Sequence, residues 1–391
     1  MTRRTASAAL VAASVTVAAL IGEVGLRVLA PQPTGATPFV EHPTLVSRMA
    51  PDASGTISLP GVYRYAWSHD ADGRRVTPGA DADTSAGSVL VLGDSFGYGM
   101  GVQPDETFAA GLARALASRG SPVRVVNGSA VGKGPAYALR LLESVGRGWR
   151  GDAVVYAFYP NDFANLRHGI YAALDQGVLA DPGGDAPNVR RRARIGNAPG
   201  VRWLAERSHV AGLVRRAALG AVGTNGPGPE LVDLDTTSAP TPYHTADVLP
   251  LVEAVLAALD STVQARGGRL VTLYVPSAAE VAAFRRTGGP SADEAAFDAL
   301  RRAVGLDGVS ATPALAASGM PVGRLYFPEI HWRPRAHALA AAALRDPVQA
   351  ALCERDLSRP GCDRAPEAVR RIAASRAARP AGERARRTPA D

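Results

Sequence analysis

The sequence predicts an α/β protein built on a parallel sheet, and three observations lead to this prediction. From Ser88 onward, short apolar segments alternate with amphipathic helical segments. Several apolar segments end in turns that contain Gly, Ser or Asn. The chain has 391 residues, of which 46% are hydrophobic, enough for a large core. We therefore expect a sheet covered by helices on both faces, with ligands bound at the carboxyl ends of its strands.

Residues 1–30 are expected to form a transmembrane signal anchor. Two arginines precede an uncharged run that ends at Ile21, and Glu23 and Arg27 follow. A cleaved signal peptide is the alternative, but Pro31 is unfavourable directly after a cleavage site. The long side chains of Glu23 and Arg27 are expected to reach the interface. Positive residues stay in the cytoplasm, so we expect the anchor to place the rest of the chain in the periplasm or cell envelope. The anchor itself is expected to contact inner-membrane lipid. Cleavage would instead give a secreted form.

Residues 31–87 are rich in Pro, Gly, Asp and Ser and are interpreted as an extracytoplasmic linker with a small N-terminal cap. The cap is predicted to hold one strand pair, 61–68 with 74–77. The main domain is assigned to residues 88–350. Its predicted strands are 89–92, 123–127, 153–158 and 270–275, and its predicted helices are 105–119, 135–146, 248–266 and 334–344.

An insertion at residues 163–245 interrupts the alternation. It contains a predicted amphipathic helix at 201–222, which includes Trp203. A long insertion beside a site serves as a lid or substrate wall. A packing element or partner surface is an equally good interpretation.

Residues 351–391 are expected to be a basic, partly disordered tail. From Arg364 the tail holds eight arginines and three acidic residues, so it accounts for most of the formal net charge of +7. No basic, aromatic-interleaved motif is present, which argues against nucleic-acid binding. Cys353 and Cys362 have no metal-ligand spacing; an oxidising compartment would permit a bridge, and two free thiols are the alternative.

Four segments carry candidate chemistry. Ser95 follows an apolar strand in Gly-Asp-Ser, Gly132 lies in a glycine turn after the second strand, and Asn161 follows the third strand. The fourth segment is Glu329-Ile-His331, which precedes a helix. Acyl transfer needs a nucleophile, a base, a group that orients the base, and donors for the oxyanion. Ser95, His331 and Glu329 supply the first three, and the N–H groups of Ser95 and Gly132 with the Asn161 amide supply the oxyanion hole.

This arrangement resembles the GDSL or SGNH hydrolases, named for Ser, Gly, Asn and His in four blocks, and the likeness covers residues 88–344. It implies a flavodoxin-like three-layer α/β/α sandwich and ester hydrolysis or acyl transfer without metal or organic cofactor. It is also similar to a bacterial subgroup with an N-terminal membrane anchor. Two residues depart from the pattern: Tyr159 replaces a glycine, and Glu329 replaces an aspartate. Glu329 is one methylene longer than aspartate, so a displaced contact, a Ser–His dyad without an acid, and Asp307 as the acid are the alternatives to Glu329 as the orienting group.

Other polar residues are interpreted as structural. Asp94 and Asp162 are expected to bond loop amides, and Lys133 to be solvated rather than to bind an anionic substrate. His337 is expected to be structural within the last helix. The remaining candidates, His168, His209 and His244, are expected at the surface or in the cap rather than as ligands.

The function hypothesis is a serine esterase that acts on small, glycan-linked O-acyl groups through an acyl-enzyme. An O-acyltransferase with the same site and a non-catalytic glycan-binding protein on the same fold are the alternatives. Gly-x-Ser-x-Gly at Ser95 also fits the elbow of an α/β-hydrolase, but only one convincing strand precedes it. The sequence leaves the acyl chain, the acceptor and the oligomeric state open.

Overall fold

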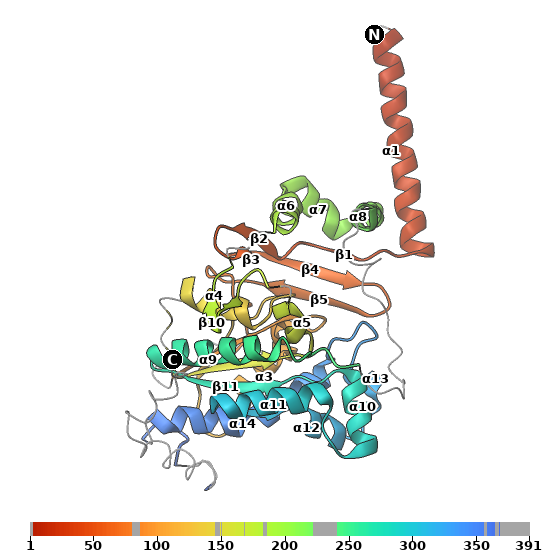
Figure 1. The fold of residues 1–391 in the computed structure, drawn as a ribbon. Helices are drawn as coiled ribbons and strands as arrows, with labels where there is room; N and C mark the ends of the chain where they lie inside the picture. The colour runs from red at the N-terminus through yellow and green to blue at the C-terminus, as the bar shows by residue number, and fades with distance from the viewer. Residues whose placement is uncertain are drawn as a thin grey trace.

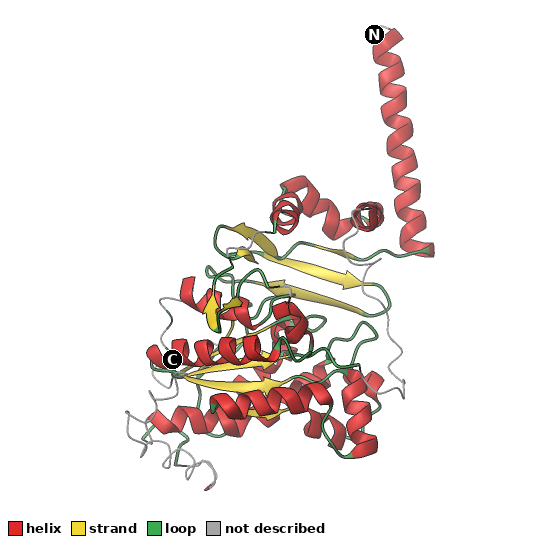
Figure 2. Ribbon diagram, in the orientation of Figure 1, coloured by secondary structure: helices red, strands yellow, loops and turns green. Residues whose placement is uncertain are grey.

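A five-stranded parallel sheet lies between two layers of helices in the computed structural model, which describes residues 3–79, 87–144, 149, 151–167, 169–182, 186–221, 241–355, 358–363 and 367 (Figures 1 and 2). When its strands are numbered in chain order, they lie side by side in the order 2-1-3-4-5, which is the flavodoxin-like order. The predicted three-layer sandwich is therefore confirmed. Its spatial order is β12 (Asp307–Ser310), β11 (Arg269–Tyr274), β8 (Ala153–Phe158), β6 (Ser88–Gly93) and β7 (Arg124–Asn127).

Alternate residues of each central strand enter two separate cores. Val89 and Val91 of β6 join one core, whereas Leu90 and Leu92 join the other. All four are buried, and burial of each such side chain stabilises the fold by about 1.5–3 kcal/mol. Five helices cover the first core: α3 (Phe108–Ala117), α10 (Ala278–Thr287), α12 (Thr312–Ala317), α13 (Val322–Leu325) and α14 (Pro334–Arg355). Four helices cover the second core: α4 (Pro135–Ser144), α5 (Asn161–Arg167), α9 (Leu249–Ala265) and α11 (Ala292–Val304).

The four predicted strands each agree with the structure to within one residue. The fifth strand, β12, was not predicted, because its four residues are only half-buried and lack an apolar run. The predicted helix 105–119 divides into a 3-10 turn at Pro104–Glu106 and α3, because the Thr107 side chain caps α3 by accepting from the N–H of Ala110.

The cap contains more strands than the sequence predicted. β1 (Thr34–Gly35), β4 (Ser54–Leu59) and β5 (Tyr63–Ser68) form an antiparallel sheet, and β2 (Phe39–His42) pairs with β3 (Val46–Met49). The predicted pairing of 61–68 with 74–77 is present only next to its turn, where the N–H of Val76 donates to the carbonyl oxygen of Ser68 at 2.9 Å, and the rest of β5 pairs with β4 alone. The segment after β5 makes only isolated bridges, from Arg75 to His69 and to Asn127.

The insertion contains three helices that lie over the cap strands: α6 (Pro187–Gly196), α7 (Pro199–Arg207) and α8 (His209–Ala221) (Figure 1). It also holds a hairpin of β9 (Ala173–Asp175) and β10 (Val178–Ala180). The single predicted helix 201–222 is wrong: Ser208 has extended backbone angles, ends α7, and accepts from the N–H of Ala211 in α8. Because α6 contacts β2 and β3, and α7 contacts β1 and β4, these helices form a layer on the cap.

The long helix α1 (Arg3–Leu29) projects from the body of the protein (Figure 1). By length and composition it could cross a membrane: its span Thr5–Leu29 has a mean hydropathy of 2.0 and is not buried against the protein. Glu23 and Arg27, which are expected to lie near the interface, pair with each other at 2.8 Å and bond to α7 and α8.

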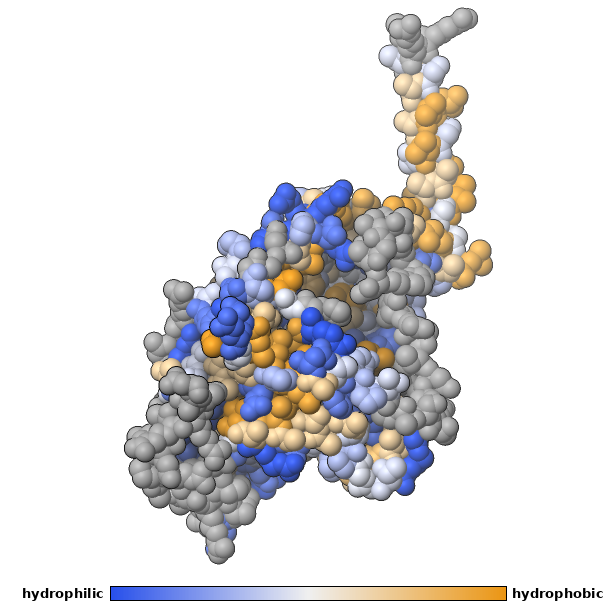
Figure 3. Space-filling model, in the orientation of Figure 1, coloured by the Kyte–Doolittle hydropathy of each residue, from blue (hydrophilic) through white to orange (hydrophobic). Residues whose placement is uncertain are grey.

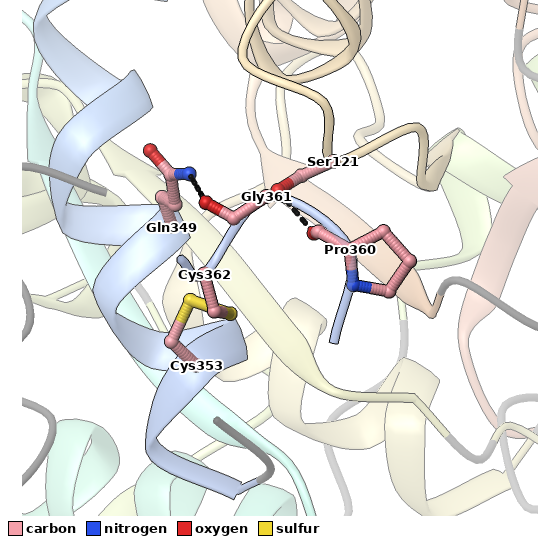
Figure 4. The surroundings of a disulfide bond; sticks show 6 residues. All are labelled: Ser121, Gln349, Cys353, Pro360, Gly361 and Cys362. Atoms are coloured by element: carbon pink, nitrogen blue, oxygen red, sulfur yellow. Dashed lines mark hydrogen bonds between the residues drawn. A yellow bond between two sulfur atoms is a disulfide. The ribbon is translucent and has the colours of Figure 1, made fainter. Parts of the chain in front are cut away.

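A disulfide joins Cys353 in α14 to Cys362 (Figure 4). Of the two possibilities left open by the sequence, a disulfide or two free thiols, the structure has the disulfide. Gln349 donates to the carbonyl oxygen of Gly361 at 2.9 Å, and the Ser121 hydroxyl donates to that of Pro360 at 2.8 Å. The folded chain therefore continues past the predicted boundary at residue 350. Of the tail assigned to residues 351–391, residues 356–357, 364–366 and 368–391 lie outside the described residues, as does His168.

Candidate active site

The carboxyl ends of three neighbouring strands carry three of the predicted site residues. Ser95 begins α2 (Ser95–Tyr98) directly after β6, Gly132 lies in the loop after β7, and Asn161 begins α5 soon after β8. β6 and β8 flank the point where the strand order reverses. Open α/β sheets bind ligands at such a switch point. The topology therefore gathers these residues at the edge where a site is expected.

The turn that holds Ser95 is fixed by its neighbours. The Asp94 side chain caps α2 by accepting from the N–H of Phe96 at 2.8 Å. A Cβ at Gly93 would lie 2.9 Å from the carbonyl oxygen of Ala157 in β8, so only glycine permits this approach. The turn is therefore pressed against the next strand, and Ser95 is largely buried with 9% exposure.

Ser95, His331 and Glu329 are joined by two consecutive hydrogen bonds. The Oγ atom of Ser95 lies 2.7 Å from Nε2 of His331. Nδ1 of His331 lies 2.8 Å from Oε2 of Glu329, which also accepts from the backbone N–H of His331. Because an ionised carboxylate only accepts, this pairing places the proton on Nδ1 and leaves Nε2 to accept from the serine hydroxyl.

A strained turn brings Glu329 to the imidazole. Tyr326 bridges to Trp332, and the N–H of Phe327 donates to the carbonyl oxygen of His331, which closes a tight loop. Within it, Ile330 has a φ of 90°, which is rare for a β-branched residue. This turn accommodates the longer side chain, so Glu329 reaches the imidazole without displacement. Asp307, the alternative acid, instead begins β12 and lies away from the carboxyl edge.

Aromatic rings hold the imidazole from one side. The ring centroid of Phe96 lies 4.9 Å from that of His331 and 4.3 Å from that of Tyr159, with which it is stacked. Trp332 meets the edge of Phe96 at 5.6 Å. Tyr159, which stands where the family pattern has glycine, is thus a buried packing residue behind the nucleophile turn.

Two buried carboxyls lie behind this turn. Burial raises the pKa of Asp94 to about 6, against the opposing effect of its hydrogen bond from Phe96. Burial and then the nearby Asp94 raise the pKa of Asp162 well above its usual range. Asp162 accepts from the Tyr156 hydroxyl at 3.0 Å and from the N–H of Tyr159 at 3.3 Å. Both residues make the loop contacts that the sequence led us to expect.

The residues assigned to the oxyanion hole lie on the same edge. Gly132 has a φ of 68°, and a Cβ there would meet no atom within 4 Å. Within the described ranges, Oδ1 of Asn161 is buried and has no hydrogen-bond partner. A left-handed glycine beside open space leaves room for an anion at Gly132, whereas the unpartnered Oδ1 of Asn161 is an acceptor and does not itself bind one.

Lys133 is not solvated, which corrects the prediction. Its Nζ donates to the Tyr171 hydroxyl at 2.9 Å and the Ser47 hydroxyl at 3.1 Å, and it lies over the Tyr137 ring. Burial lowers the pKa of Lys133 to about 8. The side chain thus joins the cap to the insertion.

Three histidines have structural contacts, which the sequence predicted for His337. His337 is buried in α14 and accepts from the N–H of Phe108 at 3.3 Å. His209 accepts from the N–H of Gln32 at 2.8 Å, and His244 lies 2.6 Å from Asp293. No cluster of potential metal ligands occurs in the part of the chain that the structure describes.

Tyr63 is a site neighbour that the sequence did not reveal. Its ring meets the edge of Phe327 at 5.4 Å, and burial followed by the charge of Glu329 raises its pKa. Tyr63 begins a cap strand, so only the packing of the cap on the main domain brings it here. The alternating aromatic pattern Tyr63-x-Tyr65-x-Trp67 was the available signal.

No protein-family model and no curated protein matches the chain. Solved structures to which it is similar include a protein of the G-D-S-L family from Desulfitobacterium hafniense DCB-2, with 9% identity over 66% of this chain and 97% of that chain and a TM-score of 0.36. Another is the esterase EstA from Pseudoalteromonas sp., with 13% identity over 67% and 96% and a TM-score of 0.35. A third is a two-domain esterase active on acetylated mannans, with 11% identity over 68% and 49% and a TM-score of 0.36.

The chain is thus similar to GDSL/SGNH hydrolases and esterases of solved structure. Scores of this size indicate a loose likeness, so the fold class rests on the strand order of the sheet. The class that the fold and site define is a flavodoxin-like α/β/α protein with a Ser–His–Glu hydrogen-bonded chain at its switch point.

Proposed function

We propose that this protein is a serine ester hydrolase of the GDSL/SGNH type. The observation that carries the proposal is the chain of contacts from Ser95 Oγ to His331 Nε2, and from His331 Nδ1 to Glu329. A non-catalytic binding protein on this fold would need no such alignment. The alignment therefore favours an enzyme over the binding alternative.

The reaction follows from the positions of the protons. Ser95 Oγ attacks the ester carbonyl while its proton moves to Nε2 of His331, and Glu329 stabilises the imidazolium. The N–H groups of Ser95 and Gly132 and the Asn161 amide receive the oxyanion. The proton then passes from Nε2 to the leaving alcohol, which leaves an acyl group on Ser95. Water, deprotonated by His331, releases the carboxylic acid; a sugar hydroxyl in its place gives acyl transfer.

We assign the protein to the extracytoplasmic face of the inner membrane, with α1 as its anchor. The Cys353–Cys362 disulfide supports this side, because disulfides persist in oxidising compartments. An ester hydrolase in that position meets cell-surface glycans, so small O-acyl groups on glycans are the proposed substrates. Hydrolysis is the primary proposal, and transfer to a sugar uses the same first half-reaction.

Covalent labelling by a fluorophosphonate probe tests the nucleophile. The wild-type protein should be labelled, whereas Ser95→Ala and His331→Ala should not. Ser118→Ala, at an exposed serine near the end of α3, is the matched control and should be labelled like the wild type. Equal labelling of Ser95→Ala and wild type would overturn the proposal. A panel of p-nitrophenyl esters from acetate to palmitate then defines the acyl chain, and a preference for acetate is expected.

A further inference from the structure

The last two turns of α1 are bonded into the folded domain. The carboxylate of Glu23 accepts from the backbone N–H groups of His209 and Val210, at 2.9 and 3.0 Å, and from the Ser208 hydroxyl at 2.8 Å. Arg27 pairs with Glu23 and donates to the carbonyl oxygen of Arg207 at 2.8 Å. Glu23 therefore caps the N-terminus of α8, and α1 is not joined to the domain by a free linker.

With α1 inserted as proposed above, these bonds set the level of the membrane surface. A charged side chain is costly in the hydrocarbon region, so the bonded Glu23 marks the membrane boundary. The segment from Thr5 to Gly22 is about 27 Å long at a rise of ~1.5 Å per residue, close to the thickness of a hydrocarbon core. A Cβ at Gly22 would lie 3.8 Å from Val210. The start of α8 is thus at the level where α1 leaves the lipid, and α6 and α7 lie on the same side of the cap (Figure 1).

Each helix of this layer turns one face to the cap. In α6, Arg190 donates to the carbonyl oxygen of His42 at 2.7 Å, and Arg194 pairs with Glu41 at 3.0 Å. In α7, Arg202 donates to the carbonyl oxygen of Ser54 and lies over the Trp67 ring. These contacts use the inner side of the helices.

The opposite side, which we call the outer face, is apolar and cationic. Trp203 is 58% exposed and Val214 is 61% exposed. No acidic partner of Arg191 or Arg192 occurs among the described ion pairs. Figure 3 shows strongly hydrophilic residues over α6 and α7, with apolar residues beside them toward the base of α1. The outer face is made by Arg191, Arg192, Ile195, Trp203, Leu204 and Val214.

The charge of this layer is concentrated and positive. Residues 187–221 contain eight arginines and one acidic residue, so the segment carries a net charge of +7, equal to the formal charge of the whole chain. Exposed apolar side chains with arginines and a tryptophan are typical of helices that lie in a membrane interface. Anionic headgroups complement this charge.

We propose that the outer face of α6–α8 lies on the lipid surface beside α1 and binds anionic phospholipid headgroups. Trp203, Leu204, Ile195 and Val214 enter the boundary between headgroups and acyl chains, while Arg191 and Arg192 contact lipid phosphates. The inference rests on the proposed anchoring of α1 and adds a second, peripheral contact. Together with the Glu23 bonds, this contact fixes the orientation of the catalytic domain on the membrane.

Tryptophan quenching by lipid tests the contact on the full chain. The protein is reconstituted into vesicles of phosphatidylglycerol and phosphatidylcholine whose acyl chains are brominated close to the headgroup. Because α1 contains no tryptophan, the anchor itself gives no signal. We expect quenching in the wild type that is lost in Trp203→Phe and retained in Trp149→Phe, the matched control. Vesicle flotation of each variant shows whether the anchor is inserted.

The outcomes separate the two proposals. Failure to float refutes the anchoring and with it the contact, whereas flotation without quenching refutes the contact alone and leaves the outer face to a protein partner. Quenching that persists in Trp203→Phe also refutes the contact. The double variant Arg191→Glu with Arg192→Glu should weaken the quenching, as should pure phosphatidylcholine. Arg114→Glu with Arg335→Glu, at exposed positions on α3 and α14, should not change it.

Discussion

Two regions of the molecule each contain a glutamate that accepts backbone N–H groups, and the comparison shows how the same local chemistry serves different ends. At the carboxyl edge of the sheet, Glu329 accepts from the N–H and the ring of His331, and that ring touches Ser95. At the base of α1, Glu23 accepts from the N–H groups of His209 and Val210 at a helix N-terminus. The first carboxylate orients a group that moves protons, whereas the second joins two helices.

The surroundings of the two glutamates differ in a way that matches these two roles. Glu329 lies among buried aromatic rings, and its side chain is only 1% exposed. Glu23 lies beside a layer whose outer face is exposed, apolar and positively charged. A buried, nearly rigid site suits chemistry, and an exposed amphipathic face suits contact with a surface. The predictions below separate these two roles.

The largest expected effect is on chemistry. Ser95→Ala should lower kcat/KM for a p-nitrophenyl ester by roughly 10⁴-fold or more, because the nucleophile is lost. Vesicle flotation of this variant should match that of the wild type. An active Ser95→Ala protein would show that the chemistry takes place elsewhere, so the role assigned to the Glu329 region would be wrong.

Glu329→Gln should lower kcat by roughly 10²- to 10⁴-fold with little change in KM, because a neutral amide no longer stabilises the imidazolium or fixes its tautomer. Steady-state kinetics on the same ester measure the effect. Glu329→Asp, which shortens the side chain at the Ile330 turn, should fall between Glu329→Gln and the wild type. Unchanged kcat in Glu329→Gln would show that Ser95 and His331 act as a dyad.

The disulfide is expected to stabilise the fold without taking part in the reaction. Cys353→Ser with Cys362→Ser should lower the free energy of unfolding by about 2–3 kcal/mol, the loop-closure value for a loop of this length. Denaturant unfolding measures the difference. A reducing agent should shift the wild type by a similar amount and leave the double variant unchanged. Activity at room temperature should stay close to that of the wild type.

Glu23→Gln should loosen α8 while leaving ester turnover intact. Loss of charge-assisted hydrogen bonds at a helix N-terminus costs about 1–2 kcal/mol. Hydrogen exchange of the first amides of α8 should therefore become faster, with Glu329→Gln as the control that leaves these amides protected. Reduced kcat in Glu23→Gln would show that the two regions are coupled.

The smallest effect is on pH dependence. Burial lowers the pKa of His69 to about 4 and that of His337 to about 3, from an ordinary value of 6.5. The unfolded chain binds these protons first, so stability is complete above about pH 6.5 and declines as the pH falls toward the folded values. At about pH 5.8, each histidine should lower the free energy of unfolding by ~1 kcal/mol. Thermal unfolding of His337→Gln across this range should show a shallower decline, and an unchanged slope would contradict the assignment.

Local signals predicted most of the sheet and the residue types of the site. The apolar segments, with their glycine and asparagine turns, gave four of the five strands and placed Ser95, Gly132 and Asn161 at one edge. The short strand β12 has no such signal. The helix break at Ser208 was missed because apolar residues recur at helical spacing on both sides of it. The concentrated charge of residues 187–221 was hidden in a near-neutral total for the chain before the tail.

The sequence by itself determined the alternation of strands and helices, because hydrophobic periodicity and turn residues act over a few neighbouring positions. It also determined which side chains could serve as nucleophile, base and acid. Only the tertiary structure decided that Ile330 adopts a left-handed turn and brings Glu329 to His331, that β5 pairs with β4, and that Glu23 caps α8. Such contacts join segments distant in the chain, and their geometry depends on packing that no local pattern records.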